Sequence, residues 1–585
     1  MSLFSALGVA VTSINALNTS VRTVSDNVAN ANNPNYNRRE ESFESLQTGG
    51  VRIADIRRIA NEGLQRDLFS QTADATADAT RERLYREIEQ ITGTVNSETP
   101  LGEAFERFRT AWKAFEAAPE SDAAAAEVRI AGDAIVNELQ RLSDGLDLVE
   151  NQVLSEVDDA VTRLNVALAE VDRLNNAIVR DLAGGRPVSQ LENLRDRQLE
   201  AVSSLIDIRT FKRDDGSVSV YTTTGLDLTD RNASTFTWDA ATRQLTKSGS
   251  PSTDLVTGGQ LPDGELSALI SFIRTDQTAQ DSTASGLGAL EKMRNHLDEV
   301  AYSLVDDATR ATTSSSVMQA TSTLASLGIN AGDEFTIDVG AGAVTVPSGG
   351  GALGAAIDAT DTVQNLLDEL NAIANVRARL TAYGTLEIST VAGTDLTLND
   401  TTGTPLQTLG LITTDPQTFA ARDPQTFASA YNNATGLAGE AANFFEVETG
   451  TTPLSASRTN LRVNDTITSG AEGLKTLSGN DVVEALNGSN RDLRGSALRL
   501  TNETYTGLAS GVLVDLVKQS ERATTLAGES ETLRADLQQT LRDEVGVSID
   551  EEMARLTVLQ NSYAASARVI DSVNQMLQAL ENAVR

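Results

Sequence analysis

The two ends of this 585-residue chain carry the same seven-residue apolar repeat. Near the start, apolar residues recur in steps of four and three until residues 30–34, where asparagine and proline favour a turn. These positions are Leu3, Leu7, Ala10, Ile14, Leu17, Val21, Val24 and Val28. Near the end, the same frame runs through Ile549, Met553, Leu556, Tyr563, Ala567, Ile570, Leu577 and Val584. The repeat predicts a long coiled-coil helix at each end, with these residues as its packing seam.

The C-terminal helix carries a second apolar stripe. It passes through Leu559, Val569, Val573, Met576 and Leu580. Two stripes make the helix apolar over a broad arc, so it needs more than one neighbour. Either the terminal helices pair with each other in an ordinary domain, or they stay loose in the monomer and order when copies pack together. The repeat fits both alternatives.

Between the ends, the pattern of apolar and turn-forming residues changes twice along the sequence. Residues 121–181 contain no proline and keep helical spacing, which is typical of a rod-like helix, and residues 490–544 are also predicted to be helical. A shorter helix is expected over 189–205 and another over 284–312. From about residue 206 the pattern is that of short strands, with a turn at Asp214-Asp215-Gly216.

Residues 313–425 have the composition of a small inserted module. A strand is predicted over 334–339, a helix over 362–376, a hairpin over 379–388 and a strand over 396–398. The predicted fold class is therefore multidomain α+β with a nested layout. Its parts are terminal coiled-coil helices (1–40 with 546–585), a helical rod (41–188 with 471–545), a β-rich domain (189–312 with 426–470) and the α+β insert (313–425).

Composition excludes several classes of protein. The formal charge of −35 argues against a nucleic-acid partner, because phosphates would be repelled. The chain has no cysteine, which excludes disulfides, thiolate metal sites and thiol nucleophiles. No apolar run reaches the roughly 20 residues needed to span a bilayer, so no membrane association is expected. The N-terminus lacks the features of a cleaved signal peptide.

No candidate for catalysis or for cofactor or metal binding withstands inspection. Residues 349–354 satisfy G-x-G-x-x-G, but no doubly wound unit surrounds them, so a flexible loop is expected. His296 is the single histidine, and we expect it at the surface or at a boundary. We interpret Glu551 and Glu552 either as solvated residues on a helix face or as negative charge at a helix N-terminus. The chain is therefore not expected to be an enzyme.

Residues 24–38 resemble the N-terminal signature of the flagellar rod and hook axial proteins. The matching positions are Asn27, Ala29, Asn30, Asn32, Pro34, Tyr36 and Arg38. Asn35 replaces the usual glycine, and asparagine also tolerates a left-handed backbone. Residues 546–556 and 560–570 resemble the hook-associated protein 1 family in particular, as do the interior segments 191–199 and 258–261.

The resemblance implies a structural subunit of the flagellum that forms the hook–filament junction layer adjacent to the hook. It implies a homo-oligomeric tubular layer whose inner wall is made of the terminal helices, which order on assembly. The implied partners are hook protein, the second junction protein, an export chaperone and the type III export apparatus. The implied location is extracellular, with export that leaves the N-terminus uncleaved.

Two alternatives stay open. The first is hook protein or another axial subunit, against which the acidic residues 550–552 before Met553 argue. The second is a secreted coiled-coil adhesin, which would form stable dimeric or trimeric helices in solution.

Overall fold

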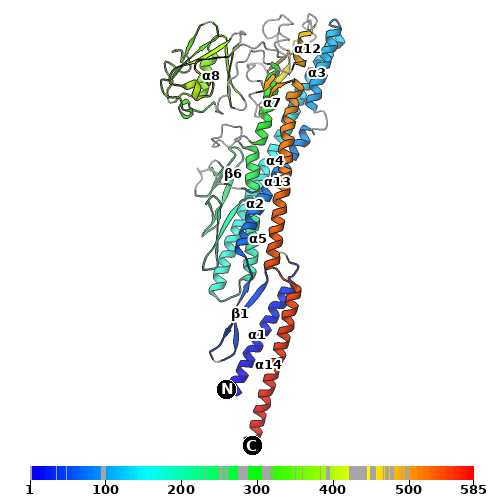
Figure 1. The fold of residues 1–585 in the computed structure, drawn as a ribbon, viewed down its shortest axis with the longest axis vertical. Coiled ribbons are helices and arrows are strands. Elements are labelled where there is room, and N and C mark those ends of the chain that lie inside the picture. The colour runs from blue at the N-terminus through cyan, green and yellow to red at the C-terminus, as the bar shows by residue number, and fades with distance from the viewer. Residues whose placement is uncertain are drawn as a thin grey trace. The chain divides into compact units, whose positions relative to one another are not determined.

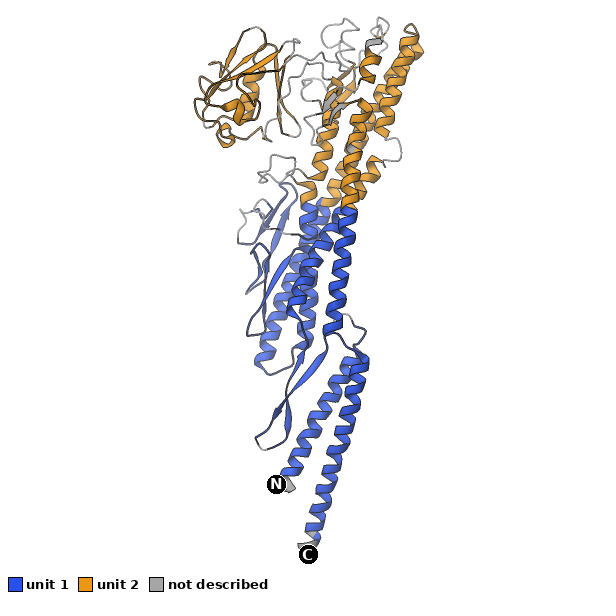
Figure 2. Ribbon diagram, viewed as in Figure 1, with its two compact units in different colours: residues 1–82, 154–270, 523–585 blue, residues 83–153, 271–522 orange. Residues whose placement is uncertain are grey.

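A computed structural model shows a chain of mixed helix and sheet, as predicted. It divides into two compact units, residues 1–82, 154–270 and 523–585 (unit 1) and residues 83–153 and 271–522 (unit 2) (Figure 2). The structure describes residues 3–33, 36–47, 49–93, 100–230, 232–249, 254–256, 261, 263–274, 288–305, 318, 320–340, 342–349, 351–358, 360–381, 384–390, 395–419, 444–447, 456–464, 467, 474, 480–488, 491–493 and 500–584. The predicted division into four domains stays a prediction.

Unit 1 contains both terminal helices. Helix α1 (Leu3–Ala29) and helix α14 (Ile549–Val584) lie side by side (Figure 1). Helix α1 ends where the asparagine-rich turn was predicted. The next segment differs from the prediction, since residues assigned to the helical rod form an antiparallel hairpin of β1 (Arg39–Ser45) and β2 (Val51–Arg58).

The hairpin packs against α1. A Cβ atom at Gly49 would lie 3.3 Å from Val9, and one at Gly50 would collide with Thr12. The close approach therefore requires glycine at the turn. A two-stranded hairpin is only marginally stable alone in water, so its contact with α1 explains why this segment forms strands.

Long helices form the bundle of unit 1. Helix α4 (Asp122–Ala183) confirms the rod-like helix predicted over 121–181, and α5 (Ser189–Leu205) confirms the helix predicted over 189–205. Helices α2 (Glu62–Thr92), α4, α6 (Glu265–Ile273) and α13 (Tyr505–Val545) each contribute residues to both units. In unit 1, six apolar residues on one side of α4 are fully buried, whereas Val166 and Leu182 are exposed. The six are Val157, Leu164, Leu168, Val171, Leu174 and Ile178.

Short antiparallel sheets complete unit 1. One has the order β3 (Ile208–Lys212), β4 (Val218–Thr222) and β5 (Asp227–Thr229), and the other pairs β6 (Phe236–Asp239) with β7 (Gln244–Lys247). The predicted turn joins β3 to β4. The buried Arg195 of α5 donates hydrogen bonds from Nη1 to the Gly216 carbonyl (2.8 Å) and to Oδ1 of Asn175 on α4 (3.1 Å). Arg195 thus fixes α5, α4 and this hairpin together.

Unit 2 gathers aromatic residues into a core. Its helices outside the insert include α3 (Pro100–Ala117), α7 (Ala289–Val305) and α12 (Asn480–Asn487). Phe108 lies 5.3 Å from Phe444 and 6.2 Å from Trp112 between ring centroids. The strands pair as β14 (Phe445–Val447) with β15 (Leu461–Val463) and as β16 (Arg491–Leu493) with β17 (Leu500–Glu503). The last pair corrects the helix predicted over 490–544, which begins only at Tyr505.

The insert forms the predicted small α+β module within unit 2. Its elements are the 3-10 turn η1 (Leu324–Leu327), β8 (Glu334–Asp338), β9 (Val344–Val346), α8 (Val363–Asn371), β10 (Val376–Leu380), β11 (Leu386–Thr390), β12 (Leu396–Thr402), α9 (Pro405–Thr408) and β13 (Gln417–Phe419). One sheet has the order β13-β12-β8-β9, and β10 pairs with β11. Thr362 caps the N-terminus of α8 and forms a capping box with Asn365. The module has a continuous apolar core of its own.

A buried ion cluster joins the insert to α7. The Arg379 guanidinium donates to both carboxylate oxygens of Glu299, at 2.9 Å each, and to Oε2 of Glu387 at 2.8 Å. It also lies 3.6 Å from the centroid of the Tyr302 ring. Burial alone would lower the pKa of Arg379, but the two carboxylates outweigh burial and raise this pKa.

Described residues in and beside the G-x-G-x-x-G loop bond to a carboxylate of α8, and the flexibility of the loop stays a prediction. The buried Glu369 carboxylate accepts hydrogen bonds from the Ser348 N–H (2.8 Å) and hydroxyl (2.5 Å), and from the Leu353 N–H (3.3 Å). A Cβ at Gly351 would collide with this carboxylate. Burial acts to raise the pKa of Glu369, but the hydrogen bonds lower it. Gly351 therefore allows the chain to approach an internal carboxylate closely. Gly350 lies outside the described residues.

The expected position of His296 was also wrong. Its side chain is 1% exposed, and its Nε2 bonds to the Leu508 carbonyl at 2.9 Å. Burial lowers the pKa of His296 to about 4, so the ring is neutral at pH 7. The residue is a core histidine because nearly every residue of α7 is covered.

Candidate assembly interface

Four polar residues join the two terminal helices within unit 1. We call them the motif cluster: Asn27, Tyr36, Arg39 and Glu552. The Asn27 amide donates from Nδ2 to Oε2 of Glu552 (3.1 Å) and to the Arg39 carbonyl (3.0 Å). Its Oδ1 accepts from the Tyr36 hydroxyl (2.9 Å) and from the Arg39 N–H (3.1 Å). One amide thus uses all its ordinary hydrogen-bonding positions to connect α1, the following turn, β1 and α14.

The motif cluster is shielded from water. Asn27 and Glu552 are 0% and 1% exposed, and Tyr36 is also buried. Burial raises the pKa of the Tyr36 hydroxyl, and the carboxylates of Asp26 and Glu552 add to this effect while Arg39 opposes it. Glu552 lies in the first turn of α14, where a negative charge also interacts favourably with the helix dipole. Removal of the Asn27, Tyr36 or Glu552 side chain leaves a buried polar group without one of its partners, whereas Arg39 takes part through its backbone N–H and carbonyl.

Ion pairs surround this cluster. Arg38 donates from Nη1 to Oε2 of Glu551 at 2.6 Å, and its backbone N–H donates to the Val545 carbonyl at 2.8 Å. Arg555 of α14 pairs with the buried carboxylate of Glu41 on β1 at 2.5 Å. The start of α14 is therefore tied both to the turn after α1 and to the hairpin.

The motif residues predicted from the sequence divide into two groups. Asn27, Tyr36 and Arg38 converge on the start of α14. Asn30 and Asn32 belong to the turn after α1, where the Asn30 amide donates to the Asp26 carbonyl at 2.8 Å, and Ala29 is exposed. Pro34 lies outside the described residues. The turn group ends the helix, and the converging group joins it to α14.

Sequence reasoning missed Arg39, Glu41 and Arg555, and it read Glu552 as charge on a solvated face. One signal could have located Glu552. It precedes Leu556 and Leu559 by four and seven residues, so it falls on an apolar face of the helix. A carboxylate at such a position predicts a buried partner.

The seam residues have different environments on the two helices. On α1, Val24 is buried, and the half-buried seam residues are Leu7, Ile14, Leu17, Val21 and Val28. On α14, Leu556, Ile570 and Leu577 are half-buried, while Ile549, Met553 and Tyr563 are exposed. The side chains of Leu3 and Val584 lie outside those described. One helix pair therefore does not bury the whole predicted seam.

Helix α14 exposes a second set of large apolar side chains. We call this set the α14 stripe: Val558, Val569, Met576 and Leu580, exposed by 62%, 46%, 57% and 59%. Helical geometry puts the four residues within a narrow arc, on the other side of the α1 contact from Ile549 and Met553. An exposed apolar stripe of this length is typical of a surface that packs against another protein.

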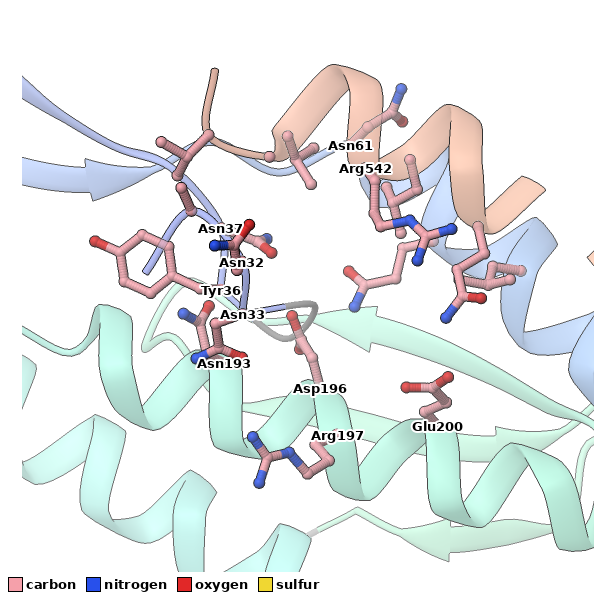
Figure 3. Close-up of a pocket in the computed structure, with 18 of the residues that line it drawn as sticks. Asn32, Asn33, Tyr36, Asn37, Asn61, Asn193, Asp196, Arg197, Glu200 and Arg542 are labelled. Carbon is pink, nitrogen blue, oxygen red and sulfur yellow. The ribbon is translucent and has the colours of Figure 1, made fainter. Parts of the chain in front are cut away.

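A cleft lies where the turn after α1 meets the bundle. It has a volume of about 330 Å³. Its walls come from the turn (Asn32, Asn33, Tyr36, Asn37), from Asn61 before α2, from α5 (Asn193, Asp196, Arg197, Glu200) and from Arg542 of α13 (Figure 3). Its lining mixes polar residues with apolar ones such as Leu68 and Phe69, so the contact here differs from a close-packed apolar core.

The described residues hold no group of three or more histidine, aspartate or glutamate side chains placed to bind a metal ion. Among the helices that the structure describes, none combines the length and apolarity needed to cross a membrane.

Comparisons with known proteins agree with these features. The family model of the flagellar basal body rod FlgEFG protein C-terminal matches residues 543–583, which include all of α14 but its last residue. At its C-terminus the chain is thus similar to the flagellar axial proteins.

A more particular resemblance comes from the interior. The family model of the flagellar hook-associated protein FlgK helical domain matches residues 85–322. Flagellar hook-associated protein 1 of Bacillus subtilis (strain 168) is 22% identical over 250 residues, which cover 40% of this chain and 49% of that relative. These two findings confirm the resemblance to flagellar hook-associated protein 1, over about half of the curated relative's length.

One solved structure is also similar. It is the flagellar hook junction protein FlgK from Burkholderia pseudomallei, with a TM-score of 0.44 and 12% identity over 81% of this chain and 99% of that chain.

Proposed function

We propose that this chain is a structural, non-enzymatic subunit of the bacterial flagellum. It forms the layer of the hook–filament junction adjacent to the hook. The observation that carries the proposal is the exposed α14 stripe on a helix whose sequence matches the axial-protein C-terminal model. Such a surface has a direct use in a protein that packs against copies of itself.

Assembly proceeds by burial of the surfaces that one helix pair leaves open. Helix α14 has the α14 stripe on one side of α1 and Ile549, Met553 and Tyr563 on the other. Two different surfaces allow each copy to contact two neighbours head to tail, and a contact of this kind that does not close generates a tube. At roughly 25 cal/mol per Å² of apolar area, each further buried side chain of the stripe contributes about 1 kcal/mol.

The motif cluster has a distinct part in this proposal. It holds α1 against α14 within one copy, so that the two helices pack against a neighbouring copy as a single unit. The terminal helices then form the inner wall of the tube, the long helices form the next shell, and the β-rich domain and the insert face outward. Whether the pair is ordered before assembly is a property of the isolated chain that can be measured separately.

The proposed partners are copies of this chain, hook protein, the second junction protein, an export chaperone and the type III export apparatus. The proposed location is the extracellular flagellum, reached without cleavage of a signal peptide.

Immunogold labelling of intact flagella tests the proposed location. Label confined to a short band between hook and filament is expected. Label along the hook or along the filament would show a different axial subunit, and unlabelled flagella would contradict a flagellar role altogether. The adhesin alternative predicts stable dimers or trimers of the purified chain by analytical ultracentrifugation, whereas we expect monomers at low concentration.

A further inference from the structure

The insert contacts α7 through the outer side of the hairpin formed by β10 and β11. Side chains alternate along a strand, so Ala378 and Ile388 contribute to the apolar core of the insert. Arg379 and Glu387, which pair directly across the two strands, lie on the opposite side of the hairpin. Both are buried, although that side faces away from the core of the insert. Helix α7 covers this side and contacts Arg379 there.

The insert itself fixes the position of the Arg379 side chain. Beside it in the chain, the Ala378 carbonyl accepts from Nδ2 of Asn371 (2.7 Å), and the Ala378 N–H donates to Oδ1 of Asn371 (2.8 Å). These two bonds join β10 to the end of α8. Across the hairpin, Nε of Arg379 donates to Oε2 of Glu387 at 2.8 Å. The guanidinium is therefore held from within its own module, and both of its Nη atoms reach α7.

Helix α7 contacts the guanidinium on its edge and on its face. Glu299 and Tyr302 are three residues apart and thus share one side of the helix. The two carboxylate oxygens of Glu299 accept from Nη1 and Nη2, at 2.9 Å each, in a forked contact that fixes direction as well as distance. The Tyr302 ring lies against the face, with its centroid 3.6 Å from the guanidinium carbon. Together the two contacts restrict the hairpin to one orientation on the helix.

Helix α7 is in turn fixed to other helices of unit 2. Arg294 pairs with Glu150 of α4 at 2.6 Å and also with Asp147. His296 bonds to the Leu508 carbonyl of α13 at 2.9 Å. A module that is fixed to α7 is therefore fixed to the long helices of unit 2 as well.

The charged groups of this contact depend on one another. Glu299 is 1% exposed, and Arg379 is a cation that bonds to both Glu299 and Glu387. Without the guanidinium, the two carboxylates would stay in a dry space without that cation, which is costly unless water enters. Separation of the hairpin from α7 would admit that water, so loss of Arg379 favours other positions of the insert.

We infer that Arg379 is a positioning residue: its contacts with Glu299 and Tyr302 hold the insert in one orientation on α7. The insert is thus a fixed part of unit 2 and not a module that moves freely on its two chain connections. Its place on the outer surface of a flagellum rests on the proposed function, whereas its orientation on α7 is a property of the isolated chain.

Spin-label distance measurements test this inference directly. The chain has no cysteine, so Asp144→Cys on α4 and Thr401→Cys on β12 give two unique labelling sites, both exposed. In the otherwise unchanged chain, pulsed electron–electron double resonance should give one narrow distance distribution between α4 and the insert. Arg379→Gln should broaden it and shift its maximum. Arg379→Lys should keep part of the narrow population, because a lysine keeps the charge but lacks the forked geometry.

A second label pair separates a change of orientation from a loss of folding. Ala356→Cys and Thr401→Cys both lie at exposed positions of the insert, which has an apolar core of its own. The distance between these two labels should stay narrow in Arg379→Gln. The control substitution is Asp368→Asn, because Asp368 is an exposed residue of α8 that accepts from Gln364 of the same helix at 2.8 Å. It should change neither distribution.

A narrow distribution between α4 and the insert in Arg379→Gln, or equal broadening by Asp368→Asn, would overturn the inference. If Arg379→Gln unfolds the insert, Glu299→Gln and Tyr302→Leu carry the same test from α7, outside the insert, and each should broaden the distribution to a smaller extent. Narrow distributions in both of these variants and in their combination would contradict the inference. None of these measurements requires flagella, so their outcome is separate from the immunogold test of the proposed function.

Discussion

Helices α4 and α14 both carry apolar residues at helical spacing, yet their environments are opposite. In the part of α4 that belongs to unit 1, the six apolar residues named above, from Val157 to Ile178, are fully buried, and Val166 on the other side of the helix is exposed. On α14, Ile549, Met553 and Tyr563 of the predicted seam are exposed, as is the whole α14 stripe. The spacing of apolar residues identifies a packing side of a helix, but the number of neighbours present decides whether that side is covered.

The difference also shows which polar residues each helix needs. Where α4 packs, Asn175 and Arg195 satisfy isolated backbone groups beside an apolar core. At the start of α14, the motif cluster adds buried hydrogen bonds that connect α14 to α1 and β1. Because the apolar sides of α1 and α14 are only partly covered, we expect each hydrogen-bonded residue between them to contribute a larger share of the stability of this helix pair.

The largest effect should come from the buried side of this comparison. Leu168→Ala on α4 should lower the free energy of unfolding by about 2 to 5 kcal/mol, because it removes buried methyl groups and leaves a cavity in a bundle that cannot collapse around it. Chemical denaturation followed by circular dichroism measures the loss. A loss below about 0.5 kcal/mol would mean that this part of α4 is no more tightly packed than α14.

Acid should destabilise the buried region through His296. Its folded pKa of about 4 lies below the usual 6.5, so the unfolded chain binds a proton that the folded chain does not. The stability is therefore fully present above pH 6.5 and is lost as the pH falls toward 4, by about 3 kcal/mol in total. Because His296 is the single histidine, its ring protons give one unambiguous NMR titration. A measured pKa near 6.5 would contradict its burial, and His296→Phe should flatten the pH dependence.

Asn27→Ala should weaken the connection between α1 and α14 by about 2 kcal/mol, because Tyr36, Arg39 and Glu552 each lose a hydrogen-bond partner in a dry environment. Hydrogen exchange of the first turns of α14 reports this change, with faster exchange expected. Asn15→Ala is the control, since Asn15 is an exposed asparagine of the same helix. Equal exchange in the two variants would show that the motif cluster does not hold the pair.

Asp74→Asn on α2 should stabilise unit 1 at neutral pH by about 1 kcal/mol, after allowance for solvent screening. Burial raises the pKa of Asp74 to about 6, and the carboxylates of Asp263, Asp207 and Asp78 add to this. The folded chain thus keeps a proton that the unfolded chain has lost, so stability falls as the pH rises from 3.8 to about 6. Thermal unfolding at pH 7 should show the gain, and at pH 3.5 the variant and parent should agree. Asp67→Asn, at an exposed position of the same helix, should change neither.

The smallest effect on the monomer should come from Leu580→Ala, which makes the same chemical change as Leu168→Ala at a residue that is 59% exposed. We expect less than about 0.5 kcal/mol in the free energy of unfolding, because little buried surface is removed. Assembly is a different matter, and sedimentation at increasing concentration should show weaker self-association. A variant that associates as strongly as the parent would remove the α14 stripe from the proposed contact.

Much of the fold could be predicted from local pattern. The rod-like helix, α5, the β3–β4 turn and the elements of the insert follow from periodicity, turn residues and capping residues that lie close together in the sequence. The hairpin at 39–58 was missed because its exposed strands lack a clean alternation, and its stability comes from α1. The strands β16 and β17 were missed because helical residues continue directly after them.

For the candidate interface, the sequence by itself determined the apolar repeats and the asparagine-rich turn, because both depend on neighbours along the chain. Only the tertiary structure decided that Asn27 meets Glu552, 525 residues away, and that Arg379 meets Glu299. It also decided that His296 is buried and that the α14 stripe is not. Periodicity states which residues share a side of a helix, whereas burial and ion pairing depend on which distant element covers that side.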